Sequence, residues 1–162
     1  MHSREGMTGG LCGCKGAIYF IVILFYFFNR LFSNALSLTP RARRSPVAQG
    51  LLEGCSAFAL LHEVRFSSRR PERLLHPGIT ALVFPNFYHS DTLELLWLLA
   101  REGVRDGRTA RAVALVRGKR LADGTWAQEK DLNTVATVGK KGQSNAFITE
   151  RAQEVMGYYD RR

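Results

Sequence analysis

The second half of the chain contains two short continuous apolar runs, and a segment with a helical pattern of apolar residues lies between them. Residues 79–84, ITALVF, form an apolar run with β-branched side chains between turn-forming residues, which is typical of a strand buried on both faces. Residues 110–116, ARAVALV, predict a second buried strand, and residues 92–102 predict a helix that ends at Gly103. Two buried strands joined by one helix form a right-handed βαβ unit, so the expected fold class is α/β.

Further elements are expected after this unit. Residues 124–130 predict a short strand, the alternating residues 133–138 predict an edge strand, and residues 146–159 predict a C-terminal helix interrupted near Gly157. The helix over residues 92–102 is apolar around most of its circumference. We therefore expect it to be covered on more than one side, by a sheet and by another chain.

The first part of the chain is dominated by a second kind of apolar run. Residues 17–28 are all apolar or aromatic, a length typical of a signal peptide, whereas a bilayer span needs about 20 residues. Extending the run over residues 16–38 reaches that length but places Arg30 near its middle. A single hydrophobic membrane anchor is favoured, with a cleaved signal or a buried helix of a larger complex as alternatives.

Charge around this run suggests an orientation and a destination. Basic residues are more numerous after the run than before it, so the positive-inside rule places the C-terminal part on the cytosolic or matrix side. Residues 39–77 are Arg-rich and Ser-containing, like a mitochondrial presequence, with a basic linker that carries a short amphipathic helix over residues 51–64 as the alternative. The expected organisation is an N-terminal segment 1–38, a basic region 39–77 and a small basic domain 78–162. Mitochondria are favoured, with a plastid or the endoplasmic reticulum open.

Composition adds a strong positive charge to this picture. The formal net charge is +9, and a basic cluster in the second half is equally compatible with two interpretations. It binds an anionic partner, which is nucleic acid, anionic lipid or an acidic protein surface, or it is a solvated face that keeps the protein soluble. The candidate partner-binding residues are Arg105, Arg108, Arg111, Arg117, Lys119 and Arg120. Cys12, Cys14 and Cys55 lack metal-ligand spacing, so neither a metal nor a cofactor is expected.

The residues before the predicted helix raise the question of catalysis. His89 and Asp91 precede it, where a loop at the end of a strand binds ligands in α/β proteins, so His89 could act as an acid or base and Asp91 could orient it. The competing interpretation, which we favour, is that Asp91 caps the helix and Glu94 completes a capping box.

The segment YHSDTL also resembles a motif of the N-acetylglucosaminyl-phosphatidylinositol de-N-acetylases, which have a membrane anchor and a zinc site in a His-Pro-Asp-Asp-Glu sequence. His89 and Asp91 match the first His and the first Asp. Thr92 and Leu93 replace the second Asp and the Glu, which removes a metal ligand of that family. The resemblance implies a membrane-anchored α/β hydrolase-type enzyme.

Taken together, these patterns predict a non-enzymatic, membrane-anchored or organelle-imported accessory or structural subunit of a larger assembly. It contacts an anionic partner through its basic face. The alternatives are the hydrolase-type enzyme and an organellar, ribosome-associated RNA-binding protein.

Overall fold

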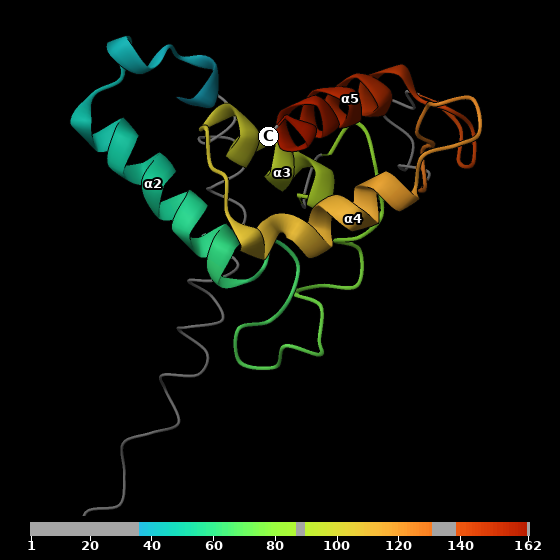
Figure 1. The fold of residues 1–162 in the computed structure, drawn as a ribbon, viewed down its shortest axis with the longest axis horizontal. Coiled ribbons are helices and arrows are strands. Elements are labelled where there is room, and N and C mark those ends of the chain that lie inside the picture. Colours follow the sequence, from blue (N-terminus) through green and yellow to red (C-terminus); the bar gives the residue numbers. More distant parts are fainter. Residues whose placement is uncertain (1–35, 87–89, 131–138, 162) are drawn as a thin grey trace, which may run out of the picture.

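The computed structural model describes residues 36–86, 90–130 and 139–161, and its architecture is helical (Figure 1). Helix α3 lies between α4 and α5, and α2 runs along the side of this group. The segment between α2 and α3 projects beyond α4. The helical elements are η1 (Arg41–Arg43), α2 (Pro46–Leu61), α3 (Thr92–Arg101), η2 (Gly107–Thr109), α4 (Ala110–Gly118) and α5 (Ala146–Asp160).

Helix α2 has a clear start and an unusual end. Ser45 caps it by accepting a hydrogen bond from the backbone N–H of Ala48 at 3.2 Å, and Pro46 occupies the first helical position. At the other end, Glu63 and Val64 have left-handed backbone conformations with φ of 43° and 69°. The N–H of Val64 bonds to the carbonyl of Ala59 at 2.7 Å, so the chain turns sharply away from the helix axis.

Helix α3 begins and ends where its sequence predicts. The Asp91 side chain accepts the N–H of Glu94 at 2.8 Å, which confirms Asp91 as the N-cap. After the helix, Gly103 has a φ of 72°, a conformation that glycine adopts without strain. Leu96 and Leu99 are 0% exposed in the core that α3 forms with the neighbouring helices, so its own chain covers the apolar surface of α3.

One hydrophobic core joins the described elements. It includes Ala59 and Leu60 of α2 together with Leu82 from the segment before α3 and Trp126 from the segment after α4. Trp126 is 1% exposed, and its indole N–H donates to the carbonyl of Val116 at 2.7 Å. Because buried Tyr and Trp rings need a partner for their polar atom, this bond anchors the segment after α4 on that helix.

The prediction of an α/β fold is wrong. Within the described residues the extended pairing is limited to isolated antiparallel bridges, between Phe66 and Leu74, Arg120 and Trp126, and Ala127 and Ser144. Residues 110–116 lie in α4 and not in a strand. The buried residues Ala112, Val113 and Val116 follow helical spacing, with Ala114 exposed and Leu115 partly buried between them, so the period of burial is that of a helix.

Residues 79–84 form turns instead of the expected strand. The N–H groups of Ile79 and Ala81 bond to backbone carbonyls within the turns, and those of the last three residues bond to side chains instead of a neighbouring strand. Leu82 donates to Glu129 Oε2 at 2.6 Å, Val83 to Asp91 Oδ2 at 3.0 Å and Phe84 to Gln128 Oε1 at 3.0 Å. The apolar run therefore reflected true burial, and the strand assignment failed because side chains supply the acceptors.

The described part of the chain also differs from the prediction of a membrane helix. Over residues 36–86, 90–130 and 139–161, no helix combines the length and the apolar character needed to cross a bilayer. The apolar run 17–28 and the predicted edge strand 133–138 lie outside the described residues. The expected C-terminal helix is confirmed as α5, and it continues through Gly157 without interruption.

Candidate functional site

Four of the six predicted partner-binding residues pair with carboxylates of their own chain, and three of these pairs are close. Arg108 contacts Asp106 at 2.8 Å, and this hydrogen-bonded guanidinium lowers the pKa of Asp106 to about 2. Arg117 pairs with Asp160 and Lys119 pairs with Glu129, each at 2.5 Å. These contacts distribute the predicted cluster over separate ion pairs.

Arg105 and Arg120 contact carbonyl groups and aromatic rings, and Arg111 combines a longer ion pair with an aromatic contact. Arg105 donates to the carbonyl of Tyr158 and lies 4.3 Å from its ring centroid, and Arg120 donates to the carbonyl of Gly124. Arg111 pairs with Glu63 at 3.3 Å but remains 58% exposed. Exposed ion pairs contribute only about 0–1 kcal/mol, so an incoming anion can compete for such a cation.

A second group of arginines lies in a loop that sequence reasoning assigned to a presequence or linker. We call residues 65–75 the arginine loop. It is closed by the bridge between Phe66 and Leu74 and by a bond from the N–H of Ser67 to the carbonyl of Arg73 at 2.8 Å. Within the described part of the chain, no hydrogen bond or ion pair is made by the exposed side chains of Arg69, Arg70 and Arg73.

The base of the arginine loop lies against α4. Arg65 donates through Nη2 to the carbonyl of Arg111 at 3.3 Å. The guanidinium carbons of Arg65 and Arg111 lie 4.7 Å and 4.1 Å from the ring centroid of Phe66. Two cations therefore share one aromatic ring, and Glu63 is the nearby carboxylate that pairs with Arg111. We call Arg65, Phe66 and Arg111 the stacked cluster.

The two guanidinium groups of the stacked cluster repel each other. Burial and the neighbouring charge of Arg111 lower the pKa of Arg65, while Glu63 partly opposes this effect. Among the described residues, the Nε of Arg65 is a buried side-chain donor without a hydrogen-bond partner. An anion placed beside these two guanidinium groups would reduce their repulsion.

We use the name basic surface for Arg65, Arg69, Arg70 and Arg73 of the arginine loop together with Arg111, which lies at the base of the loop through its contacts with Arg65 and Phe66. Of the predicted residues, the structure brings only Arg111 into it. The available signal was the density of arginine over residues 65–73, but nothing in the sequence indicated that this segment packs on α4.

Of the predicted catalytic pair, only Asp91 belongs to the described residues, because His89 lies outside them. Asp91 is buried and accepts hydrogen bonds from the N–H groups of Glu94 and Val83 and from Asn86 Nδ2. Burial, followed by the nearby charge of Glu94, raises the pKa of Asp91 to about 6. Its carboxylate oxygens hold the segment before α3 in place, which is a structural role.

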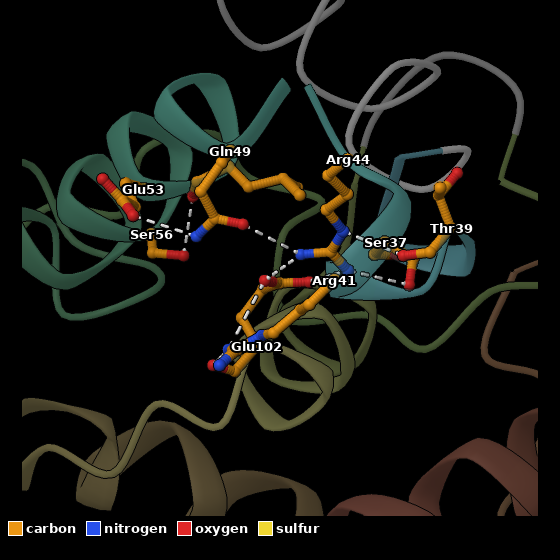
Figure 2. A network of polar contacts seen from close by, with 9 residues as sticks. Ser37, Thr39, Arg41, Arg44, Gln49, Glu53, Ser56 and Glu102 are labelled. Carbon is orange, nitrogen blue, oxygen red and sulfur yellow. Dashed lines mark hydrogen bonds and ion pairs between the residues drawn. The ribbon is translucent and has the colours of Figure 1, made fainter. Parts of the chain in front are cut away.

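A buried ion pair lies at the opposite end of α3 (Figure 2). Arg44 contacts Glu102 through both guanidinium nitrogens, at 2.7 Å and 3.0 Å, and donates to the carbonyl of Thr39 at 2.8 Å. Arg41 also donates to the backbone carbonyl of Glu102. The side chains of Arg44 and Glu102 are 4% and 5% exposed, so this pair connects the segment before α2 to the end of α3.

Within the described ranges, no three His, Cys, Asp or Glu side chains converge in a way that could hold a metal ion. Comparisons of the chain with protein-family models, with curated proteins and with solved structures return no match.

Proposed function

We propose that this protein is a non-enzymatic accessory subunit that binds an anionic partner through the basic surface. The observation that carries the proposal is the set of exposed arginines in the arginine loop, whose side chains lack partners within the described residues. The loop is held against α4 beside Arg111, so its charges add to the charge of a structured element. Such a concentration of positive charge attracts anions and accelerates their encounter.

The geometry also supports a second contact, with a protein partner. On α2, the side chains of Val47, Leu51 and Leu61 are 74%, 51% and 59% exposed. Gly50 and Gly54 lie on the same helix, and a Cβ added to either would meet no atom within 4 Å. Large exposed apolar side chains on one helix are a feature of interaction surfaces, which agrees with a subunit of a larger assembly.

The proposal is tested by retention of the full chain on immobilised heparin. We expect retention at physiological salt, and we expect the triple variant Arg69→Ala, Arg70→Ala, Arg73→Ala to elute at clearly lower salt. The three side chains make no described hydrogen bonds or ion pairs, so the variant keeps its fold. Bound cations release counterions, which explains why their removal lowers the salt needed for elution.

A matched control separates a local surface from net charge. The variant Arg43→Ala, Lys130→Ala, Lys140→Ala removes the same formal charge from exposed positions outside the basic surface. It should elute close to the unmodified chain. Equal losses in both variants, or no retention of the unmodified chain, would contradict the proposal.

A further inference from the structure

We infer that the anionic partner is a single-stranded nucleic acid, with the stacked cluster as the point where a base and its adjacent phosphate are bound. This inference depends on the proposed function, because it assigns a chemical class to the partner of the same basic surface. Nucleic acid combines regularly spaced phosphates with planar bases.

The side chains of the basic surface have the chemistry that binding of nucleic acid requires. Every cation of the basic surface is an arginine, whose planar guanidinium binds phosphate through two N–H groups and also stacks on flat rings. Arg111 lies 4.1 Å from the Phe66 ring centroid and stays 58% exposed. The ring therefore holds a guanidinium plane at the surface, and bases stack on such planes in RNA complexes.

A second feature is the approach of two guanidinium groups, those of Arg65 and Arg111, to the same aromatic ring. The buried Nε of Arg65 lacks a hydrogen-bond partner within the described residues, and the neighbouring cation is Arg111. A phosphate beside the pair would accept from the guanidinium groups and reduce the repulsion between them. Arg69, Arg70 and Arg73 then lie in the same loop to contact the following phosphates.

A third feature is the left-handed backbone that precedes the stacked cluster. Glu63 and Val64 have left-handed φ values of 43° and 69°, a conformation that is strained for a β-branched residue such as Val64. This turn directs Arg65 and Phe66 onto α4 and places Glu63 beside Arg111. Strained backbone of this kind concentrates at binding sites, where the rest of the fold maintains it.

The test uses a charge-conserving substitution, because lipid head groups and acidic peptides respond to charge, whereas bases also respond to a stacking plane. Arg111→Lys keeps the charge and a cation that can pair with Glu63 but removes the guanidinium. We expect it to weaken binding of a fluorescein-labelled uridine oligonucleotide about tenfold in an anisotropy titration with the full chain. The slope of log affinity against log salt should stay unchanged.

Arg43→Lys is the matched control, since Arg43 is exposed and lies outside the basic surface and the stacked cluster. It should keep the affinity of the unmodified chain. A thymidine oligonucleotide of the same length distinguishes DNA from RNA as the source of the same chemistry. Circular dichroism of both variants checks that the helices are retained.

The inference is overturned if Arg111→Lys binds the oligonucleotides as tightly as the unmodified chain. Stronger binding to phosphatidylserine vesicles than to either oligonucleotide also overturns it. In both cases, retention on heparin that depends on the arginine loop still supports the proposed function. Loss of both heparin retention and oligonucleotide binding would remove the proposed function and this inference together.

Discussion

Two arginine-rich segments of similar composition differ in this protein, because one contains a buried arginine, Arg44, and the other exposes Arg69, Arg70 and Arg73. In the first, Arg41–Arg44, the structure buries Arg44 against Glu102 and orders Arg41 on the carbonyl of the same residue. In the second, the arginine loop, the side chains of Arg69, Arg70 and Arg73 are exposed and make no described ion pair. The difference shows that the number of arginines in a segment does not indicate how much charge it offers to a partner.

The physical cause is the cost of burying charge. A guanidinium removed from water needs a carboxylate and further acceptors, and Arg44 finds both in Glu102 and the carbonyl of Thr39 (Figure 2). The loop arginines remain hydrated, so their charge stays available at little cost. Arg44 and Glu102 cancel each other within the formal net charge of +9, so the location of the remaining cations decides what an anionic partner meets.

The largest expected effect in this comparison is the loss of stability caused by Arg44→Ala. This substitution leaves Glu102 buried without its main partner, so we expect the free energy of unfolding to fall by about 3–5 kcal/mol. Urea denaturation followed by circular dichroism measures the change. Arg43→Ala, at an exposed neighbouring position, should stay within about 0.5 kcal/mol of the unmodified protein. Similar losses for both substitutions would mean that Arg44 and Arg43 do not differ in this way.

The contrast between buried and exposed charge extends to acids and predicts a pH dependence. The pKa of Asp91 is raised from 3.8 to about 6 by burial, so the folded state binds this proton more tightly than the unfolded state. The free energy of unfolding should therefore decrease as pH rises from about 4 to 6, by about 3 kcal/mol from this group. Exposed Asp106, with its pKa lowered to about 2, acts in the opposite direction and only below about pH 4.

Asp91→Asn removes this titration while keeping a capping oxygen for the N–H of Glu94. Denaturation curves at several pH values should then lose the decrease between about pH 4 and 6. A decrease of equal size in the variant would assign the pH dependence to other groups.

Replacing both members of the buried pair sharpens the interpretation of the first experiment. The double variant Arg44→Leu, Glu102→Leu leaves neither charge in the interior, so we expect it to be more stable than Arg44→Ala and within about 2 kcal/mol of the unmodified protein. A double-mutant cycle from denaturation curves provides the coupling energy. If the double variant is as unstable as the single one, packing and not the lost charge determines the effect.

The smallest expected effect is on the stability of the arginine loop variant. Arg69→Ala, Arg70→Ala and Arg73→Ala remove exposed side chains without described contacts, so each should change the free energy of unfolding by less than about 0.5 kcal/mol. The same curves used for Arg44→Ala measure this. A large loss would show that these arginines take part in the fold, and the contrast with Arg44 would disappear.

Some elements could be predicted because their signals are local. Asp91 and Gly103 mark the ends of α3 through hydrogen bonds and backbone conformations that involve only a few neighbouring residues. Helix α5 was predicted on the same basis, from its pattern and the turn residues before it. The capping role of Asp91 was also predicted in this way, and its burial was not.

Other elements could not be predicted because distant residues decide them. The segment 79–84 is apolar like a strand, yet its N–H groups bond to Glu129, Gln128 and Asp91. Residues 110–116 are short enough that a strand and a helix are equally compatible with their apolar content, and packing against α3 and α5 selects the helix. The basic surface depends on Arg65 meeting the carbonyl of Arg111, a contact between residues far apart in sequence.

Local sequence signals were enough to predict the caps of α3, the existence of α5, the positive charge and the positions that are apolar enough to be buried, but the interruption expected near Gly157 is absent. Only the tertiary structure decided that the described chain is helical, that Arg44 is buried and that the arginine loop lies beside Arg111. The reason is that capping and charge are properties of a few adjacent residues. The satisfaction of buried polar groups, in contrast, depends on partners that the folded chain alone brings together.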